Sequence, residues 1–357
     1  MAKTRVLVVG LGNMGRSHAL AHHTNPSSQI VGLVNRSTPA LPEDLQAYPQ
    51  FSTMDDGLAL RPDLVVIATY ADSHADLAIQ AMEAGAHVFV EKPLAATVAD
   101  ALRVADTARR TGRKLVIGYI LRHHPSWQRL IAEARALGGP YVFRMNLNQQ
   151  SKGAEWEVHK ALMRSTSPLV DCGVHYVDVM CQVTDATPVR VHGMGLRLSD
   201  EIAPDMYNYG QLQVTFADGS VGWYEAGWGP MMSETAFFVK DVVGPKGSVS
   251  LVPNDQARTD EGLSGSADID KHTKTDAIRI HRAAVGADKN FTTPDEILSM
   301  EDEPGHQELC DREQAFFLKA INEDIDLSDA MDAAVNSLRI VLAAEQSIIE
   351  ERVIRLD

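Results

Sequence analysis

A lysine at the predicted end of a strand is the first residue whose type and position suit a role in catalysis or ligand binding. Lys92 follows the apolar run His87–Val90 and precedes Pro93. The run is typical of a buried strand, and the proline biases Lys92 away from helix, which fixes the lysine where the chain leaves the sheet. Ligands of open α/β sheets bind beyond the carboxyl ends of the strands, so Lys92 can reach both a cofactor and a substrate hydroxyl. In isolation the tripeptide Glu91–Pro93 is common and more typical of a solvated turn.

A carboxylate and an imidazole four residues apart form the second candidate. Asp171 and His175 share one face if the segment is helical. An imidazole titrates near neutrality and a carboxylate can orient it or the substrate, so the pair suits proton transfer. A surface ion pair or a core histidine is the plain alternative. A metal site that includes Asp178 is another, but Lys92 already supplies a cation, and we therefore expect no metal.

A glycine-rich segment near the N-terminus indicates what the lysine accompanies. Gly10–Gly15 reads G-x-G-x-x-G; it follows the apolar run Arg5–Val9 and precedes a predicted helix, Arg16–His23. A second predicted strand, Ile30–Val34, comes next. Strand, glycine motif, helix and second strand together are the context that a dinucleotide-binding fingerprint requires.

The three glycines have different physical tasks in this motif. Gly10 permits the tight turn, Gly12 lets the backbone approach a pyrophosphate, and Gly15 lets helix and strand pack closely. Asn13 and Met14 lie just before the predicted helix, where unpaired backbone N–H groups and the helix dipole favour an anion. We therefore expect NAD(P) to bind at this loop.

Length and composition fit a two-domain globular protein. The chain has 357 residues, 45% of them hydrophobic and 23% charged, and a formal net charge of −15. Such a charge disfavours nucleic acid and anionic membranes as partners. No apolar stretch approaches the length of a membrane span, and the first strand begins too early for a signal peptide.

The three cysteines, Cys172, Cys181 and Cys310, lack the spacing of a disulfide framework or of a thiolate zinc site. We therefore expect a cytoplasmic protein.

Residues 1–120 alternate predicted strands and helices, the pattern of right-handed βαβ units in a parallel sheet. Beyond the elements above, the sequence predicts strands at Leu64–Ala68 and Lys114–Gly118, and helices near Asp56–Leu60, at Ser73–Ala84 and at Val98–Thr111.

From residue 121 the pattern changes to extended runs joined by hairpin signals, which predicts a largely antiparallel sheet in meander order. The predicted helices are Arg122–Leu137, part of Leu162–Val183, Glu308–Asn322 and Ser328–Arg352, and the predicted strands are Tyr141–Asn148, Val189–Leu198, Gln211–Phe216, Val221–Tyr224 and Phe237–Val243. Residues 253–305 are expected to be loops with at most one strand.

The predicted fold class is therefore α/β. An N-terminal Rossmann domain with a doubly wound parallel sheet, residues 1–120, precedes an α+β domain, residues 121–357, built on a largely antiparallel open sheet. The last helix, about residues 328–352, is a candidate to pack back towards the first domain.

The glycine motif, Glu91–Pro93 and the segment Asp171–His175 together resemble the glucose-fructose oxidoreductase / inositol dehydrogenase / rhizopine-catabolism (Gfo/Idh/MocA) family, and the likeness covers nearly the whole chain. The resemblance implies catalysis by Lys92, which would contact nicotinamide and the reacting oxygen, by His175 as general acid/base, and by Asp171, which would position both substrate and histidine. It also implies that the open sheet forms a homodimer or homotetramer.

The same resemblance implies further contacts. Glu91, Thr69 and His74 match cofactor-binding positions, and Tyr70 stands where many members have a proline beside the ribose. Arg122 matches an arginine that commonly follows the sixth strand, and Trp156 flanks the expected substrate cleft.

Three residues at the end of the second strand depart from the family pattern. Asn35 stands where an aspartate commonly grips the adenosine ribose, followed by Arg36 and Ser37. An asparagine does not repel a 2′-phosphate, and Arg36 and Ser37 could bind one, which favours NADP(H) over NAD(H). Alternatively, Asn35 still bonds the ribose of NAD and Arg36 stacks on adenine.

The expected activity is hydride transfer between NAD(P) and a secondary hydroxyl or ketone of a sugar, cyclitol or related polyol. Two alternatives remain open: a non-catalytic NAD(P)-binding sensor or corepressor, and a reductase of a non-carbohydrate carbonyl or diol.

Overall fold

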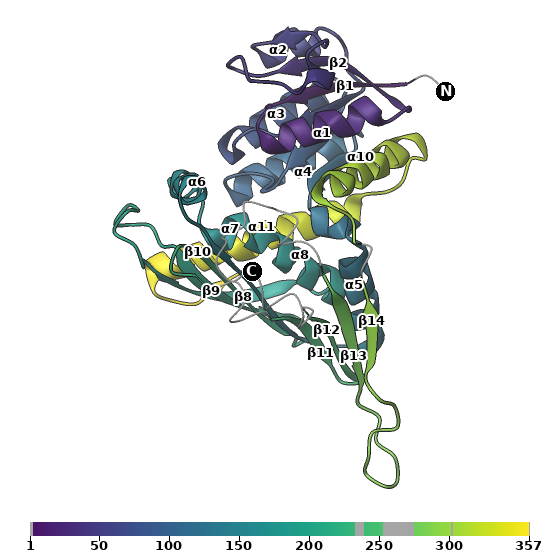
Figure 1. Ribbon diagram of the computed structural model, residues 1–357, viewed down its shortest axis with the longest axis vertical. Helices are drawn as coiled ribbons and strands as arrows, with labels where there is room; N and C mark the ends of the chain where they lie inside the picture. Colours follow the sequence, from purple (N-terminus) through teal and green to yellow (C-terminus); the bar gives the residue numbers. More distant parts are fainter. Residues whose placement is uncertain (1–2, 233–238, 253–274, 301–302, 357) are drawn as a thin grey trace. The chain divides into compact units, whose positions relative to one another are not determined.

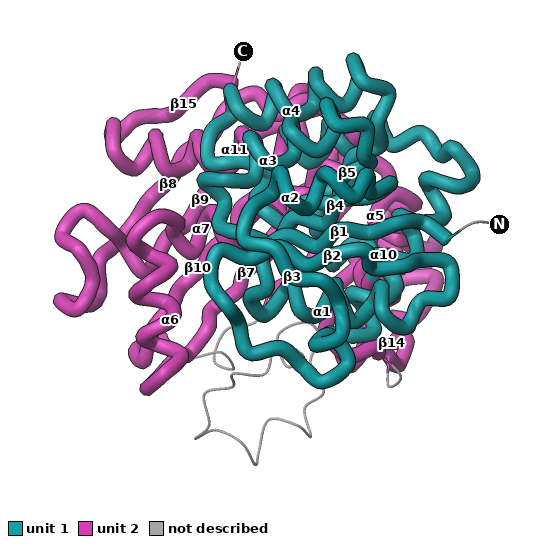
Figure 2. The backbone as a smooth tube through the Cα atoms, turned by 90° about the horizontal axis from the view of Figure 1, so that it is seen from above, with its two compact units in different colours: residues 1–123, 306–335 teal, residues 124–305, 336–357 magenta. Residues whose placement is uncertain are grey.

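The computed structural model describes residues 3–232, 239–252, 275–300 and 303–356, and the chain forms two compact units (Figure 1). Unit 1 contains residues 1–123 and 306–335, and unit 2 contains residues 124–305 and 336–357, coloured teal and magenta in Figure 2. The chain therefore leaves unit 1 after residue 123 and returns to it near the C-terminal end.

Unit 1 is built on a six-stranded parallel sheet in the order β3-β2-β1-β4-β5-β6. Its strands are β1 (Thr4–Val9), β2 (Ser28–Val34), β3 (Gln50–Phe51), β4 (Leu64–Ile67), β5 (His87–Glu91) and β6 (Leu115–Gly118). All four residues of β4 are buried, as expected of a parallel strand with both faces covered. The order reverses direction at β1, which is the topological switch point of a doubly wound sheet.

The helices of unit 1 start and stop where their sequences contain capping residues. The Thr97 hydroxyl accepts a hydrogen bond from the Asp100 amide at 3.1 Å to begin α4, and Gly112, with φ +65°, ends it. The helices are α1 (Asn13–Thr24), α2 (Met54–Leu58), α3 (Ala71–Glu83), α4 (Val98–Thr111) and α10 (His306–Asn322), with short 3₁₀ turns η1 (Glu43–Leu45) and η2 (Ile120–His123).

Helix α10 completes the hydrophobic core of unit 1 although it comes from the far end of the chain. Phe317 and Leu318, both at most 2% exposed, pack in one cluster with Val6, Leu33 and Phe89 of the sheet. Burial of two large apolar side chains stabilises the unit by several kcal/mol, at roughly 25 cal/mol per Å².

Unit 2 contains a nine-stranded mixed sheet in the order β14-β13-β12-β11-β7-β10-β9-β8-β15. The strands are β7 (Val142–Gln150), β8 (Pro188–Leu196), β9 (Tyr209–Phe216), β10 (Val221–Gly229), β11 (Lys240–Gly244), β12 (Gly247–Val252), β13 (Ala277–Arg282), β14 (Glu296–Ser299) and β15 (Ile354–Arg355). Every neighbouring pair is antiparallel except β7 with β10.

The helices of unit 2 pack on one face of this sheet. Gly193 of β8, Leu212 of β9 and Tyr224 of β10 form one cross-strand row. A side chain at Gly193 would meet the backbone oxygen of Ala344 on α11 at 2.3 Å, and Tyr224 packs against Gly173 on α8. The helices are α5 (Pro125–Leu137), α6 (Ala154–Leu162), α7 (Pro168–Asp171), α8 (Gly173–Thr184) and the part of α11 (Ser328–Glu350) from residue 336 onward.

The predicted fold class is confirmed, while several predicted elements need correction. The helix predicted from Arg122 begins at Pro125, and Arg122 lies in η2, because the residue before a proline, His124, is extended (φ −85°, ψ 121°). The meander order was wrong, since β7 lies between β11 and β10. The sequence also failed to predict α6, β3, β12, β14 and β15.

Part of the predicted strand Phe237–Val243 and much of the segment 253–305 lie outside the described residues. Among the helices that are described, none combines the length and the apolar character needed to cross a membrane.

One buried carboxyl of unit 1 has an unusual environment. Glu313 on α10 is 1% exposed, and its Oε1 has no hydrogen-bond partner among the described residues. Burial, and next the charge of Glu91, raise the pKa of Glu313 well above its ordinary value, against a lowering effect of Arg122. The uncharged carboxyl is therefore favoured in the folded protein.

The raised pKa predicts how a substitution of Glu313 changes stability with pH. A carboxyl whose folded-state pKa lies above its unfolded value stabilises fully at low pH, and that contribution is lost as the pH rises through the folded pKa. Glu313→Gln keeps the shape without the charge. We therefore expect its Tm, relative to the parent protein, to increase progressively between about pH 5 and about pH 9.

The matched control is Glu308→Gln, which removes an exposed carboxylate from the same helix. It should change Tm little and without a trend in pH. Thermal denaturation across this pH range makes the comparison, and a Tm difference for Glu313→Gln that is independent of pH would contradict the raised pKa.

Candidate active site

The loops that carry the predicted cofactor residues all leave the same edge of the unit 1 sheet. In the parallel ladders, Val9 at the end of β1 pairs with Val34 of β2 and with Ile67 of β4, and Ile67 pairs with Val90 of β5. The glycine loop, the loop after Val34, the loop after Ile67 and the Lys92 turn therefore follow neighbouring strand ends. This is the edge where doubly wound sheets bind their ligands.

The three glycines of the loop behave as their predicted tasks require. Gly10 has φ +88°, and a Cβ there would lie 2.5 Å from the Ala68 oxygen. A Cβ at Gly15 would lie 1.8 Å from the Gly10 oxygen, so both positions are closed to any side chain. Gly12 has no other atom within 4 Å of its Cβ position, which leaves its outer side open to a ligand.

The N-terminus of α1 fits a dinucleotide pyrophosphate. Gly12 is the N-cap residue, so no side chain caps the helix, and the first turn contains no acidic residue. The amides of Asn13 and Met14 lie in that turn, which leaves donors and the positive end of the helix dipole for an anion. Arg16, in the same turn, donates to Asn13 Oδ1 at 2.6 Å.

Asn35 joins the glycine loop to the loop after β2. Its Oδ1 accepts a hydrogen bond from the Leu11 amide at 3.0 Å, and its Nδ2 donates to the Ser37 backbone oxygen at 2.7 Å. The Asn35 amide thus holds two loops together, while Arg36 and Ser37 are exposed beside it.

The loop after β4 contains Thr69, Tyr70 and His74. Tyr70 is 69% exposed, and Thr69 is half-buried with its hydroxyl 2.7 Å from that of Ser73. His74 is buried, with Nδ1 2.8 Å from the Pro93 oxygen and Nε2 3.1 Å from the Thr69 oxygen. Burial lowers the pKa of His74, against the raising effect of the hydrogen bonds to Pro93 and Thr69, and the imidazole lies between two loops.

The turn after β5 exposes one side chain. From Val88 to Ala95 every residue is buried except Lys92, which is half-buried. Glu91 is 6% exposed; its Oε1 lies 2.7 Å from His18 Nε2, and its Oε2 accepts the Lys92 amide at 3.1 Å. Both oxygens of the predicted cofactor residue Glu91 are thus engaged inside unit 1.

In unit 2, the segment of Asp171 and His175 shows the same pattern. From Ser167 to Cys181 every residue is buried except these two, which are half-buried. The expected single helix is interrupted, because α7 ends at Asp171 and α8 begins at Gly173. A Cβ at Gly173 would lie 3.1 Å from the Tyr224 ring, so this glycine lets α8 approach the sheet closely.

Polar and aromatic side chains that the sequence did not indicate lie near Asp171. The Cys172 thiol lies 3.7 Å from Asp171 Oδ2 and 3.4 Å from Gln149 Oε1, which also accepts the Trp228 N–H at 2.6 Å. Gln149 and Trp228 are paired across β7 and β10, far from residue 171 in sequence, and no local motif reveals such a contact.

A buried lysine lies in the same part of unit 2. Lys240 is 5% exposed, with Nζ 5.7 Å from the ring centroid of Tyr176, the neighbour of His175. Burial lowers the pKa of Lys240 to about 7. Tyr176 also stacks on Tyr224 with ring centroids 5.0 Å apart, which fixes the start of α8 against the sheet.

The two remaining predicted substrate contacts are engaged within their own units. Arg122 donates to the Ala330 oxygen at 3.1 Å and lies over the Tyr119 ring in unit 1. Trp156 in unit 2 is 5% exposed and donates its N–H to Glu201 at 3.2 Å, as a core tryptophan would.

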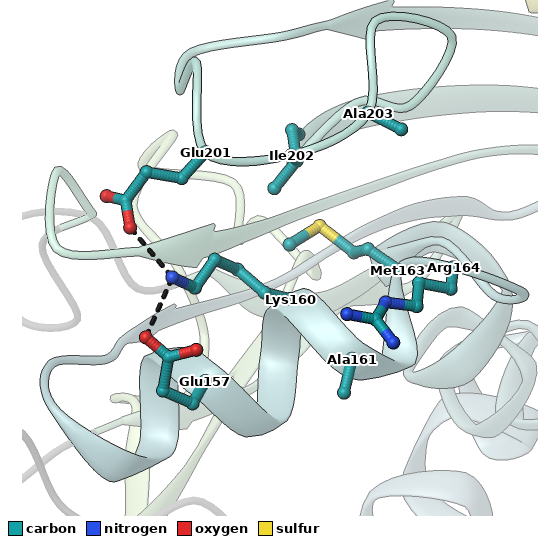
Figure 3. Close-up of a pocket in the computed structure, with 8 residues that line it drawn as sticks. All are labelled: Glu157, Lys160, Ala161, Met163, Arg164, Glu201, Ile202 and Ala203. Atoms are coloured by element: carbon teal, nitrogen blue, oxygen red, sulfur yellow. Dashed lines mark hydrogen bonds and ion pairs between the residues drawn. The ribbon is translucent and has the colours of Figure 1, made fainter.

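A pocket of about 210 Å³ lies between α6 and the loop around Glu201 (Figure 3). Lys160 points into it and is held between Glu157, at 2.8 Å, and Glu201, at 2.7 Å. These two carboxylates raise the pKa of Lys160. The pocket is lined by Glu157, Lys160, Ala161, Met163, Arg164, Glu201, Ile202 and Ala203.

Within the described ranges, no group of three or more His, Cys, Asp or Glu side chains is arranged to hold a metal ion. Asp178, the third ligand of the alternative metal site, is buried and accepts a hydrogen bond from Gln182 at 2.9 Å.

A doubly wound sheet with this glycine fingerprint is typical of a dinucleotide-binding unit. Residues 4–119 match the model of the oxidoreductase family with an NAD-binding Rossmann fold, and residues 128–250 match that of the GFO/IDH/MocA C-terminal domain. The chain belongs to the Gfo/Idh/MocA family of oxidoreductases, which confirms the resemblance found in the sequence.

Relatives of established name are similar over most of the chain. An NAD⁺-dependent scyllo-inositol 2-dehydrogenase of Bacillus subtilis is 26% identical over 271 residues, which is 70% of this chain and 74% of the relative. A D-glucoside 3-dehydrogenase of Escherichia coli is 25% identical over 272 residues, 70% of this chain and 77% of the relative.

Solved structures share the fold at lower identity. GenD2 from gentamicin A biosynthesis, crystallised with NAD, has a TM-score of 0.75 and 22% identity, covering 100% of this chain and 97% of its own. An oxidoreductase domain protein from Kribbella flavida has a TM-score of 0.76 and 20% identity, covering 100% of both chains.

The glycine geometry predicts opposite effects for two alanine substitutions. Gly15→Ala forces a Cβ against the Gly10 backbone and should destabilise unit 1 by roughly 2 kcal/mol or more. Gly12→Ala meets no protein atom, so its Tm should stay close to that of the parent. Because its methyl group occupies the side left open for a ligand, the Kd for NAD(P)H should rise about tenfold or more.

Thermal denaturation and calorimetric titration with NADH and NADPH separate the two effects. Binding by Gly12→Ala equal to that of the parent protein would show that the ligand does not approach the backbone at this glycine.

Proposed function

We propose that this protein is an NAD(P)-dependent dehydrogenase that moves a hydride between nicotinamide and a secondary hydroxyl or ketone of a sugar, cyclitol or related polyol. Family membership establishes an oxidoreductase with an NAD-binding Rossmann fold. The substrate class rests on the names of relatives, which include inositol, glucoside and UDP-N-acetylglucosamine 3-dehydrogenases.

The observation that carries the proposal is a burial pattern that recurs in both units. In Val88–Ala95 every residue is buried except Lys92, which is half-buried. In Ser167–Cys181 the half-buried residues are Asp171 and His175, and the others are buried. Burial of the flanking residues fixes the backbone, while the ionisable groups keep access to the surface. Rigid support with accessible functional groups is what a positioned acid/base site requires.

The proposed roles follow from what the oxidation of an alcohol demands. A bound nicotinamide supplies the hydride acceptor or donor. The hydroxyl proton must leave as the hydride does, and His175 is assigned as its general base, with Asp171 orienting the imidazole and the substrate. The ammonium of Lys92 is assigned to stabilise negative charge on the reacting oxygen.

The proposed cofactor is NADP(H) rather than NAD(H). Asn35 brings no negative charge to the position beside the ribose, and the exposed Arg36 and Ser37 can receive a 2′-phosphate. Thr69, Tyr70, His74 and Glu91 are proposed to support the cofactor, the last two through the loops that they hold. Arg122 and Trp156 are retained as proposed substrate contacts.

We further propose a homodimer or homotetramer formed through the open sheet. On the face opposite the one that α8 and α11 contact, Val142, Met194, Leu196 and Val221 are 41–54% exposed. Apolar side chains on a flat sheet are a common oligomer surface. Sedimentation that gives a monomer at micromolar concentration would contradict this proposal.

The proposed compartment is the cytoplasm, supported by three buried cysteines that form no disulfide, Cys172, Cys181 and Cys310.

A non-catalytic sensor is the main alternative. It predicts tight NAD(P) binding without turnover of any member of a panel of sugars and cyclitols assayed for NAD(P)⁺ reduction. Turnover restricted to apolar carbonyl compounds would instead favour the second alternative, a reductase of non-carbohydrate substrates.

Lys92→Ala and His175→Ala test the assigned roles. Each should lower kcat by roughly 10²- to 10⁴-fold, because a charge-stabilising group or a general base is lost, while the Kd for NAD(P)H changes little. Lys319→Ala and His192→Ala are matched controls in units 1 and 2, since neither belongs to the proposed site. Steady-state rates equal to those of the parent in either test variant would remove that residue from the mechanism.

Arg36→Ala tests the cofactor assignment. Loss of the guanidinium should raise the Kd for NADPH by about tenfold or more, because a charge-assisted hydrogen bond to phosphate is lost. The Kd for NADH should hardly change. Calorimetric Kd values for both dinucleotides make the comparison. Equal weakening of the two would reassign the enzyme to NAD(H).

A further inference from the structure

Unit 1 contains a chain of buried polar side chains that ends at the Lys92 turn. Glu91, His18, Gln314 and His22 are each at most 6% exposed. They come from β5, α1 and α10, and Gln314 lies 296 residues after His18. Buried polar groups are costly unless they are hydrogen-bonded. The direction of each hydrogen bond therefore shows which groups in this chain donate and which accept.

The amide of Gln314 fixes the tautomer of both histidines. Its Nε2 can only donate, so His18 Nδ1, at 3.1 Å, must be unprotonated. His18 then has its proton on Nε2 and donates to Glu91 Oε1 at 2.7 Å. The Gln314 Oε1 can only accept, so His22 donates to it from Nε2 at 3.0 Å. All donors therefore point the same way, towards Glu91.

The chain ends on the backbone that presents the lysine. Glu91 Oε2 accepts the Lys92 amide at 3.1 Å. Gly118 of β6 provides the space, because a Cβ there would lie 3.1 Å from the Glu91 carboxylate. On the other side of the turn, His74 Nδ1 lies 2.8 Å from the Pro93 oxygen. Groups on both sides of Lys92 are thus tied to buried imidazoles.

We propose that His18 and Gln314 are positioning residues for Lys92. They hold the Glu91 carboxylate in the orientation in which it also accepts the Lys92 backbone amide. This hydrogen bond fixes the backbone from which the Lys92 side chain and its ammonium extend. The inference rests on the proposed function, in which Lys92 acts on the reacting oxygen. Neither residue contacts that oxygen itself, and displacement of a catalytic group by about 1 Å is enough to lower kcat by roughly 100-fold.

His18→Leu tests the proposal, with His22→Leu as its matched control. Leucine fills the space of the imidazole but cannot donate to Glu91, so the carboxylate loses the hydrogen bond by which His18 orients it towards the Lys92 amide. His22 is one turn further along α1, equally buried and of the same type, and it contacts Gln314 rather than Glu91. His18→Gln restores an N–H near Glu91 and serves as the rescue variant.

Two readouts are needed. The first is the set of kcat, KM and the Kd for NAD(P)H. We expect His18→Leu to lower kcat roughly 10- to 100-fold with little change in Kd, and His18→Gln to recover part of that loss. His22→Leu should keep kcat within about twofold of the parent protein. The second is the rate at which acetic anhydride labels the Lys92 amine as a function of pH, followed by mass spectrometry of its peptide. We expect a change of roughly twofold or more in His18→Leu alone.

The outcomes separate this inference from the proposed function. Unchanged Lys92 labelling in a folded His18→Leu protein overturns the positioning role, whatever the rates. Equal loss of kcat in His18→Leu and His22→Leu also overturns it, because it assigns the chain to general stability. Altered labelling in a protein whose Lys92→Ala variant keeps full activity supports the positioning of Lys92 and removes only its catalytic role. If His18→Leu does not fold, Gln314→Leu provides the same test from α10.

Discussion

The buried carboxylate of Glu91 is the constraint on which the ligand-binding side of unit 1 depends. A carboxylate that is 6% exposed loses its hydration, at a cost of several kcal/mol unless it is paired and hydrogen-bonded. Its partners are an imidazole from α1 and the amide of the next residue, and the imidazole is in turn held by α10. The end of β5 and the helices α1 and α10 must therefore adopt their positions together, and these contacts fix the position of Lys92.

Much of unit 1 could be predicted from the sequence because its determinants are local. Parallel strands buried on both faces are continuous apolar runs, as in Leu64–Ile67, and threonine and glycine mark the two ends of α4. The glycine motif specifies its own backbone, since Gly10 and Gly15 are closed to side chains by neighbouring atoms. His18 was not predicted, because its partner Glu91 lies 73 residues away and no spacing rule links them.

Unit 2 was less predictable because its determinants are non-local. The parallel pairing of β7 with β10 brings Gln149 beside Trp228, and both contribute to the surroundings of Asp171. The break between α7 and α8 at Cys172 interrupts the segment of Asp171 and His175, and their i, i+4 spacing gives no sign of it. In helix α6 only Trp156 is buried, so the core that could have marked this helix involves a single residue.

The return of α10 to unit 1 has a consequence for biosynthesis. Residues 1–123 leave the ribosome long before residues 306–322, yet Phe317 belongs to the same core as the first strands, and Gln314 pairs with both histidines of α1. A nascent N-terminal segment therefore exposes apolar surface, and leaves His22 without Gln314, until residues 306–322 have been synthesised. A chaperone would therefore bind this polypeptide in the interval between the synthesis of residues 1–123 and the synthesis of residues 306–322.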